Sequence, residues 1–348
     1  MTTRMAQEIA EQPEAVRATL EALLPLREQV HELADGRRQV LFVARGTSDN
    51  AAVYGRYLLE THAGVLAALA APSVATHYRR RLDLSDVVTV SVSQSGATEE
   101  IVETQTWARE CGAATVAVTN VEGSPLAEAA DLALVTRAGP EEAVPATKTY
   151  TAQLVAMATL GTALADDPTA LDAELERVPD TIAQLLESAA GVEPAIAALH
   201  EASYAVVSGR GLMLGTALET ALKLEETCLR PVRGYSYADL RHGPISVVTE
   251  GMTAVLVAAP DGPMVDPLVS LAEDLAGRGA TVVGIGGEQR FAEACAVHVP
   301  GPDLPEALAP LGTIVPVQLM VEGLARSLGL DPDQPRGLAK VTATEPGQ

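Results

Sequence analysis

Aromatic residues and basic charge are both scarce in this sequence of 348 residues. Only 3% of the residues are aromatic, with a single Trp and two Phe. Platforms that stack nucleic-acid bases depend on such side chains, so their scarcity argues against that kind of site. Lys and Arg number 24 against 46 Asp and Glu, which gives a formal net charge of −22. An acidic surface repels phosphate backbones and anionic lipid heads, so we expect no nucleic-acid partner and no membrane partner.

Cysteine pairs and long apolar runs are also lacking. Cys111, Cys228 and Cys295 form no Cys-x-x-Cys pair and leave an odd count. This usage fits a reducing compartment, with the thiols as small core residues. No run of 18 apolar residues occurs, and residues 1–16 lack an apolar signal core. We therefore expect a cytoplasmic protein.

Short apolar runs alternate with helix-like segments along the chain. The composition is 47% hydrophobic and 20% charged, which is typical of a globular protein, and the length allows about two domains. Strand candidates lie at 39–44, 67–75, 87–93, 115–119 and 132–136, and helical patterns at 5–34, 48–62 and 97–111. Continuous apolar strands separated by helices are typical of a parallel sheet covered on both faces.

The second half of the chain repeats the layout of the first at an offset of 165 residues. The run that ends in Arg210-Gly211 matches the run that ends in Arg45-Gly46. The predicted fold is therefore α/β, with two tandem doubly wound units that have parallel sheets, and a C-terminal tail. We place a helical segment at 1–35, the first unit at 36–165, a helical connector at 166–196, the second unit at 197–330 and the tail at 331–348.

The two copies differ in the loop after the third strand of each unit. In the first copy this loop, 93–98, reads Ser-Gln-Ser-Gly-Ala-Thr and precedes a helix. Helix N-terminal amides favour an anion, and hydroxyls add donors without bulk. The matching loop 258–262 has lost the hydroxyls and gained an acid and a proline. Thr47 and Ser48 follow the first strand at the same edge of the sheet, so we predict a phosphate site there. The alternative is that the loop hydroxyls only cap the helix.

A stripe of charge marks the helix predicted over about 213–228. Glu219, Lys223, Glu226 and Arg230 follow one another at helical spacing and share one face. A solvated face with ion pairs would explain such a stripe without any chemistry. Further on, His242 precedes a Gly-Pro pair, a setting that suits an acid/base group, although a lone His is more often structural. The tail 333–340, taken alone, is a frayed terminus.

Six sequence motifs occur in order along nearly the whole chain. They are Arg-Gly-Thr-Ser at 45–48, Ser-Gln-Ser-Gly-x-Thr at 93–98, Ala-Thr-Lys at 146–148, Glu-x-x-x-Lys-x-x-Glu at 219–226, Leu-Arg-His-Gly-Pro at 240–244 and Asp-Gln-Pro-Arg-x-Leu-Ala-Lys at 333–340. Together they resemble the SIS (sugar isomerase) family. The resemblance is to the isomerase half of glucosamine-6-phosphate synthase and to its stand-alone deaminase relatives, so two tandem SIS units are expected.

The resemblance implies a role for each matching residue. Glu226 would move a proton between C1 and C2 of a sugar, with Lys223 beside it. His242 would assist ring opening and reach the site of a neighbouring subunit, and Lys340 would meet the sugar's carbonyl end. The implied substrate- and phosphate-binding residues are Thr47, Ser48, Ser93, Gln94, Ser95, Thr98, Val144 and Ala146. Relatives are dimers with shared sites, so we expect a homodimer, with no cofactor and no metal.

Two departures from the family pattern bear on the reaction. Thr2 stands where the synthase needs an N-terminal cysteine, and no amidotransferase segment is present, so we do not expect glutamine-dependent synthesis. The family's Val-Ala-Ser-Thr-Lys stretch reads Val-Pro-Ala-Thr-Lys at 144–148. The hydroxyl lost at Ala146 would contact the substrate near its amino group.

We therefore expect isomerising deamination of glucosamine-6-phosphate to fructose-6-phosphate and ammonia. One alternative is dehydration of N-acetylglucosamine-6-phosphate by β-elimination of the 3-hydroxyl, since an acetylated amine cannot leave as ammonia. Another is a sugar-phosphate sensor without catalysis, because fold alone does not establish activity. A dinucleotide site at 209–215 is a weak match, because its Gly-x-Gly-x-x-x-Gly spacing is irregular. No His, Cys or carboxylate spacing resembles a metal-ligand set.

Overall fold

The computed structural model describes residues 2–340, which divide into two compact units. Unit 1 comprises residues 2–13, 142–147 and 176–338, and unit 2 comprises residues 14–141, 148–175 and 339–340. Each unit is built around one five-stranded sheet in which every strand pair is parallel. The predicted α/β class with two parallel sheets is therefore confirmed.

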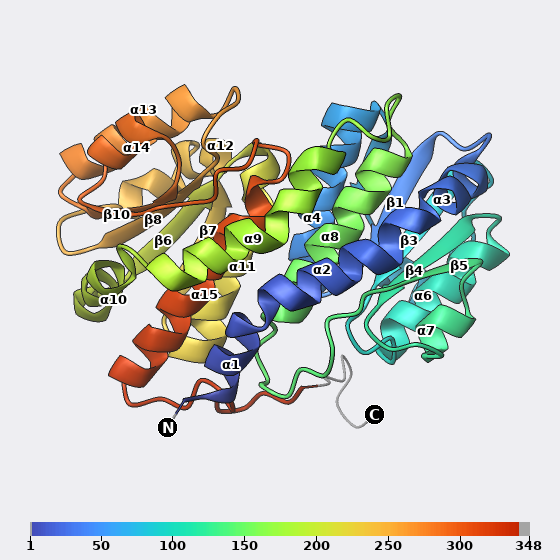
Figure 1. The fold of residues 1–348 in the computed structure, drawn as a ribbon, viewed down its shortest axis with the longest axis horizontal. Helices are drawn as coiled ribbons and strands as arrows, with labels where there is room; N and C mark the ends of the chain where they lie inside the picture. The colour runs from blue at the N-terminus through green and yellow to red at the C-terminus, as the bar shows by residue number, and fades with distance from the viewer. Residues whose placement is uncertain (1, 341–348) are drawn as a thin grey trace. The chain divides into compact units, whose positions relative to one another are not determined.

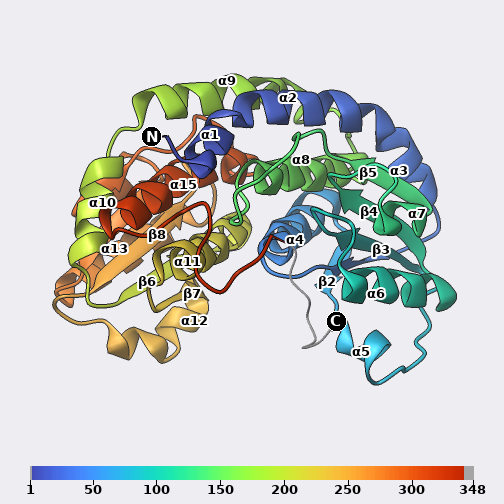
Figure 2. The same cartoon turned by 90° about the horizontal axis from the view of Figure 1, so that it is seen from below.

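The sheet of unit 2 has the strand order β2-β1-β3-β4-β5. Its strands are β1 (Gln39–Val43), β2 (Leu66–Leu69), β3 (Val87–Val92), β4 (Ala114–Thr119) and β5 (Leu132–Val135). Every residue of β3 and β4 is buried, as expected where helices cover both faces of a sheet. Helices α4 (Thr47–Leu58) and α8 (Lys148–Ala163) pack together on one face, and α6 (Glu99–Glu110) and α7 (Pro125–Glu128) on the other (Figures 1 and 2).

Two predicted elements differ from the structure. The strand expected over 67–75 ends at Leu69, and α5 (Ser73–Thr76) follows it. Pro72 lies between them and lacks the backbone N–H that a strand ladder needs. The helix expected over 5–34 is broken into α1 (Arg4–Ala10), α2 (Gln12–Leu23), the 3₁₀ turn η1 (Leu24–Leu26) and α3 (Arg27–Ala34). After α4, the π turn η2 (Leu59–Ala63) continues the helix expected over 48–62.

The sheet of unit 1 has the order β10-β9-β8-β6-β7. Its strands are β6 (Ala205–Gly209), β7 (Val232–Ser236), β8 (Thr253–Ala258), β9 (Thr281–Gly286) and β10 (Val297–Val299). Helices α11 (Leu214–Cys228) and α15 (Ala309–Ser327) pack against each other on one face, with α13 (Val265–Gly277) and α14 (Gln289–Glu293) on the other (Figure 1). The remaining elements are α9 (Asp172–Ser188), α10 (Val192–Glu201), η3 (Gly211–Met213), α12 (Tyr237–Arg241) and η4 (Pro244–Val247).

The strand orders of the two sheets are the same when their strands are matched in chain order. β1 to β5 correspond to β6 to β10, which confirms the repeat predicted from the sequence. In this doubly wound order the connections leave the first and third strands in opposite directions. Ligands bind at the carboxyl edge beside that point. The loops after β1 and β3 in unit 2, and after β6 and β8 in unit 1, are therefore the places to look for a site.

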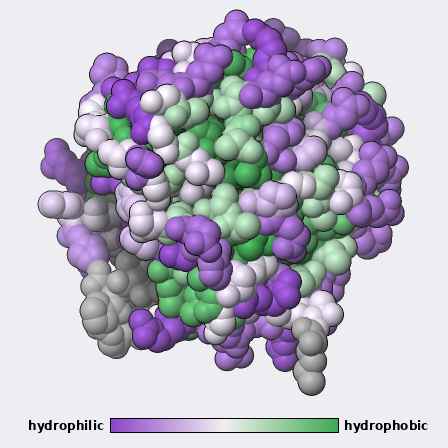
Figure 3. Space-filling view, turned by 90° about the vertical axis from the view of Figure 1, so that its left-hand side faces the viewer, coloured by the Kyte–Doolittle hydropathy of each residue, from purple (hydrophilic) through white to green (hydrophobic). Residues whose placement is uncertain are grey.

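The core is made largely of Val, Leu, Ile and Ala, and the three cysteines lie in it or at its border. Cys111 and Cys228 are buried, Cys295 is half-buried, and all three are free thiols. Burial raises the pKa of the Cys228 and Cys295 thiols to about 12, so both are unreactive at neutral pH. On the face drawn in Figure 3, hydrophobic side chains gather near the centre and hydrophilic ones at the rim.

No single helix among residues 2–340 is long and apolar enough to cross a membrane. One bent pair, α9 with α10, meets the test only when the two helices are joined across a 65° bend.

Candidate functional site

The hydroxyl-rich loop 93–98 connects β3 to α6 in unit 2. Gly96 has a φ of +62°, and a Cβ at this position would lie 2.2 Å from Ser124 Oγ. Only glycine fits there, because other residues avoid this backbone conformation and the space is filled. The backbone carbonyl of Gln94 accepts hydrogen bonds from Asn120 N–H at 3.0 Å and from Thr119 Oγ1 at 3.3 Å. The loop is thus fixed by contacts to the segment after β4.

The hydroxyls of Ser93 and Thr98 lie close together, and the Thr98 hydroxyl does not cap helix α6. Ser93 Oγ and Thr98 Oγ1 lie 3.3 Å apart, and Ser95 Oγ accepts a hydrogen bond from Ala97 N–H at 3.2 Å. Thr98 occupies the N-cap of α6, but its side chain makes no capping hydrogen bond. Helix capping therefore does not account for Thr98. The arrangement places several neutral donors at the positive end of a 12-residue helix.

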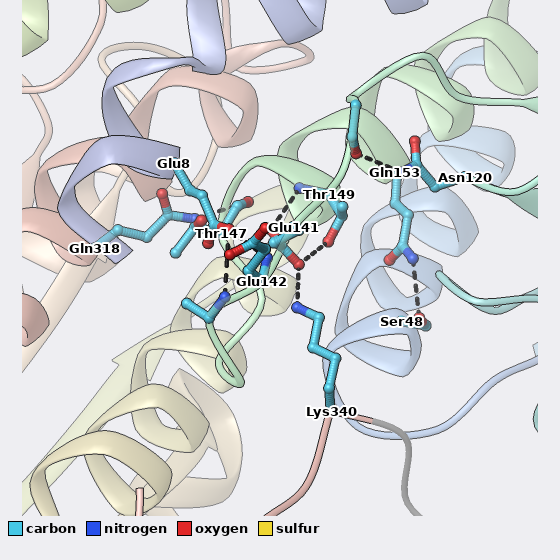
Figure 4. Close-up of polar contacts among 12 residues, drawn as sticks. Glu8, Ser48, Asn120, Glu141, Glu142, Thr147, Thr149, Gln153, Gln318 and Lys340 are labelled. Atoms are coloured by element: carbon cyan, nitrogen blue, oxygen red, sulfur yellow. Dashed lines mark hydrogen bonds and ion pairs between the residues drawn. The ribbon is translucent and has the colours of Figure 1, made fainter. Parts of the chain in front are cut away.

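Thr47 and Ser48 form the first turn of α4, directly after β1. Gly46, with a φ of +54°, provides the turn that starts the helix. Ser48 Oγ accepts a hydrogen bond of 3.0 Å from Nε2 of the buried Gln153 on α8 (Figure 4). Because Gln153 is the donor, the Ser48 hydroxyl keeps its own proton to give to a ligand. Gln153 is a site residue that sequence reasoning missed, since nothing in the sequence pairs it with Ser48.

The charged stripe on α11 is buried in unit 1, which corrects the solvated-face alternative. Glu219 and Lys223 are 0% and 1% exposed, and Lys223 Nζ lies 3.5 Å from Glu219 Oε1. The same ammonium also forms an ion pair with Glu226 Oε2. Glu226 is the accessible member, with 26% of its side chain exposed. Buried charges are tolerated only when they are paired. Glu219, Lys223 and Glu226 therefore form one cluster in which each charge has an opposite charge beside it.

Arg230 does not belong to this stripe, contrary to the spacing argument. Helix α11 ends at Cys228, and Leu229 takes a left-handed conformation with a φ of +51°. The chain therefore turns before Arg230, whose guanidinium donates to the carbonyls of His200 at 3.0 Å and Ala202 at 3.4 Å. Close to the cluster, burial and the charge of Glu226 raise the pKa of Glu225.

His242 lies at the C-cap of α12 in unit 1 and is exposed. Its backbone N–H donates to the carbonyls of Ala238 and Asp239 at 3.1 and 3.2 Å, which fixes the main chain. The following Gly243 has a φ of +130°, a conformation that requires glycine. Within residues 2–340 the imidazole has no hydrogen-bond or ion-pair partner, and the residue is exposed.

The tail is held in place, so the frayed-terminus alternative is wrong for residues 333–340. In unit 1, the Asp333 carboxylate accepts hydrogen bonds from Arg4 N–H at 3.0 Å and Met5 N–H at 2.8 Å, at the start of α1. The Asp333 carbonyl accepts another from Val144 N–H at 2.9 Å. In unit 2, Lys340 Nζ lies 2.6 Å from Glu141 Oε2 (Figure 4). Glu141 is a second residue that no sequence pattern marked.

Val144 and Ala146 lie in the segment 142–147, and both are half-buried. The Glu8 carboxylate accepts hydrogen bonds from Ala143 N–H at 3.3 Å and from Glu142 N–H, and Gln318 Nε2 donates to Thr147 O at 3.2 Å. The segment is therefore fixed inside unit 1 by groups from α1 and α15. At position 146 it presents a methyl group and no hydroxyl.

The predicted site residues fall into two sets, one in each unit. Unit 2 contains the phosphate-binding set and one catalytic residue: Thr47, Ser48, Ser93, Gln94, Ser95, Thr98 and Lys340. Unit 1 contains the other catalytic residues and the segment at 142–147: Lys223, Glu226, His242, Val144 and Ala146. Direct contacts join Ser93 to Thr98 and Lys223 to Glu226. Glu219 was part of the predicted stripe, but its burial against Lys223 could not be predicted from helical spacing.

The chain belongs to the SIS domain family, whose model matches residues 32–163 and 198–321. It is 35% identical over 342 residues to the glutamine–fructose-6-phosphate aminotransferase (isomerizing) of Aquifex aeolicus. That match covers 98% of this chain and 58% of the relative, so the chain spans somewhat over half the length of such relatives.

Two solved structures are similar over nearly their whole length. One is the C-terminal domain of glucosamine-fructose-6-phosphate aminotransferase from Francisella tularensis, at 27% identity and a TM-score of 0.86, with 96% of this chain and 99% of that chain covered. The other is glucosamine-6-phosphate deaminase from Thermotoga maritima, at 25% identity and a TM-score of 0.79, with 98% and 100% covered.

Proposed function

We propose that this protein is an amino-sugar phosphate enzyme that converts glucosamine-6-phosphate and water into fructose-6-phosphate and ammonia. The observation that carries this proposal is the cluster on α11. There a fully buried ammonium, Lys223, is held by Glu219 and paired with the more accessible carboxylate of Glu226. The similarity to a deaminase along the whole chain supports the same reaction.

The reaction begins with ring opening, which exposes an aldehyde at C1 and acidifies the proton on C2. Glu226 removes that proton, and the electron pair of the C2–H bond moves into a C1–C2 double bond with negative charge on the C1 oxygen. Lys223, which is paired with Glu226 on the same helix, supplies positive charge for this oxygen, and the family resemblance assigns Lys340 to the carbonyl end of the sugar. Return of the proton to C1, with transfer of a proton from the nitrogen to the C1 oxygen, leaves a hydroxyl at C1 and an imine at C2. Water then adds to C2 and the C2–N bond breaks, which releases ammonia and leaves the ketose phosphate.

The phosphate group binds in unit 2 at the loop 93–98. Neutral hydroxyls and the N-terminus of α6 suit a phosphate monoester even in a chain of net charge −22, because recognition is local. Ser48 adds a hydroxyl whose acceptor side is already occupied by Gln153. In this proposal His242, exposed and without a partner in its own chain's described residues, assists ring opening in the site of a second subunit of a homodimer.

Incubation of the purified protein with glucosamine-6-phosphate tests the function. We expect ammonia and fructose-6-phosphate in equal amounts, measured by enzyme-coupled assays. The variant E226Q should reduce turnover by at least about a thousandfold and leave substrate affinity within a few-fold, since it removes the base and keeps the shape. Glu225, adjacent and more exposed, offers the matched control E225Q, which should retain activity.

Two other results would contradict the proposal and identify its alternatives. An ultraviolet-absorbing product from N-acetylglucosamine-6-phosphate, formed without ammonia, would indicate dehydration. The methyl group of Ala146, in place of a hydroxyl near the substrate's amino group, is the observation that favours this second candidate. Tight binding of sugar phosphate without turnover of any amino sugar would indicate a sensor.

A further inference from the structure

The acceptor of Lys340 is a buried carboxylate that lies outside every motif of the sequence. The side chain of Glu141 is 0% exposed, whereas 26% of the Lys340 side chain is exposed. Glu141 follows β5 in unit 2, and its Oε2 lies 2.6 Å from Lys340 Nζ. A carboxylate without exposure is stable only when donors surround it, so its partners define what it does.

Thr149 fixes the orientation of this carboxylate. Its backbone N–H donates to Glu141 Oε1 at 3.1 Å and its Oγ1 donates to Oε2 at 2.7 Å, so one residue holds both oxygens (Figure 4). Thr149 stands in the first turn of α8, a 16-residue helix buried along its whole length. The positive end of this helix also favours the negative charge of Glu141. Glu141 is therefore attached to a rigid element, and its Oε2 offers a fixed point to the lysine.

We propose that Glu141 is a positioning residue that holds the Lys340 ammonium in place for the reaction. The inference rests on the proposed function, in which Lys340 meets the carbonyl end of the sugar. A lysine has four rotatable side-chain bonds, and Lys340 lies in a stretch, 331–340, without helix or strand. Glu141 compensates for this freedom, because a catalytic group is effective only when its geometry is set before the substrate binds.

The neighbouring residue provides a matched control. Glu142 is also a glutamate, but 62% of its side chain is exposed and it forms an ion pair with Arg4 instead. The variants E141Q and E142Q make the same chemical change one residue apart, and only E141Q removes the charge that faces Lys340. T149V is a milder variant that keeps the Glu141–Lys340 pair and removes one of the two hydrogen bonds that orient it.

A double-mutant cycle with K340A tests the role in the reaction. We expect E141Q to reduce kcat by about tenfold to a hundredfold with KM changed less than about threefold, and T149V to reduce it less. In the K340A background, E141Q should have no further effect, because Glu141 acts only through the lysine. Additive effects of E141Q and K340A, or an equal loss in E142Q, would overturn the proposal. Thermal melting of each variant identifies those that fail to fold.

Chemical labelling separates this proposal from the proposed function. Acetic anhydride, followed by mass spectrometry, measures how fast each lysine is acetylated without any substrate. The rate at Lys340 should rise several-fold in E141Q and stay unchanged in E142Q. An unchanged rate in E141Q would overturn the pairing even if the enzyme is active. A raised rate in a protein that turns over no amino sugar would uphold the pairing and refute the proposed function.

Discussion

The two sheets share one strand order, but the corresponding helices and loops around them differ in charge and polarity. Position for position, Glu219 and Lys223 of α11 correspond to Tyr54 and Leu58 of α4, at the offset of 165 residues. Both residues on α4 are fully buried core side chains. The matching positions on these two corresponding helices are therefore uncharged core side chains in unit 2 and a buried ion pair in unit 1. Since the matching positions in unit 2 carry no charge, we infer that the charges of unit 1 serve the proposed reaction.

The loops after the third strands also differ. In unit 2 the loop 93–98 contains several hydroxyls, whereas in unit 1 the carboxylate of Glu306 lies against the corresponding loop. Glu306 Oε2 would lie 2.1 Å from a Cβ at Gly262, and the Glu306 N–H donates to Asp261 Oδ1 at 2.7 Å. Burial and the charge of Asp261 raise the pKa of Glu306. An acidic pair in this place disfavours a second phosphate, which supports the proposal that the phosphate binds at the loop 93–98 of unit 2.

Removal of the buried ammonium should have the largest effect on stability. K223M removes the ammonium that pairs with the buried Glu219 and should cost about 3–5 kcal/mol, the usual penalty for breaking a buried ion pair. Denaturant unfolding followed by circular dichroism measures this loss. E219M/K223M, which removes both charges, should recover most of the stability and remain inactive. If the double variant is no more stable than K223M, packing rather than charge holds this part of α11.

Glycine substitutions in the two matching loops should separate binding from packing. G96A forces a Cβ to within 2.2 Å of Ser124 Oγ at a φ of +62°, so we expect a loss of about 1–3 kcal/mol and at least about a tenfold rise in KM. In G262A the new Cβ would meet the flexible end of the Glu306 side chain, and the backbone φ at this position is +91°. It should reduce the melting temperature without changing KM. A raised KM in G262A would show that the unit 1 loop also binds substrate.

The salt dependence of KM should be weak. In the proposed site, neutral hydroxyls and a helix terminus bind the phosphate, while the acidic remainder of the chain repels it, so added salt screens no long-range attraction. Between roughly 0.05 and 0.3 M salt, KM for glucosamine-6-phosphate should stay the same or fall, by less than about twofold. A steep rise in KM with salt would mean that basic residues dominate substrate capture.

The smallest expected effect concerns Glu306. Because its pKa is raised in the folded chain, the folded state is favoured when Glu306 is protonated and loses stability as pH rises from the ordinary carboxyl range through the raised value. E306Q should match the wild type at low pH and exceed it above this window. The gain should stay below about 1 kcal/mol, since the group is only half-buried. Equal melting temperatures at every pH would refute the Glu306–Asp261 repulsion.

The repeat and the hydroxyl loop could be predicted because they follow from local rules. Apolar runs mark buried strands, and a Gly among Ser and Thr residues after such a run marks an anion loop. The burial of Glu219 could not be predicted, since the same helical spacing also describes a solvated face. The partners of Ser48 and Lys340 could not be predicted from the sequence for a different reason. Gln153 and Glu141 are 105 and 199 residues away in sequence, and only the tertiary fold brings them into contact.

The attachment of Lys340 to Glu141 has a consequence for the way the protein is made. Synthesis runs from the N-terminus, so all ten strands of the two sheets leave the ribosome before residue 340 does. A chain that is released early, after residue 330, would still contain both sheets, the hydroxyl loop and Glu226. In the proposed function it would bind a sugar phosphate but lack one of the two ammonium groups, that of Lys340, at the carbonyl end of the sugar. In the proposed function, full turnover would thus begin only after translation has passed both units and reached residue 340.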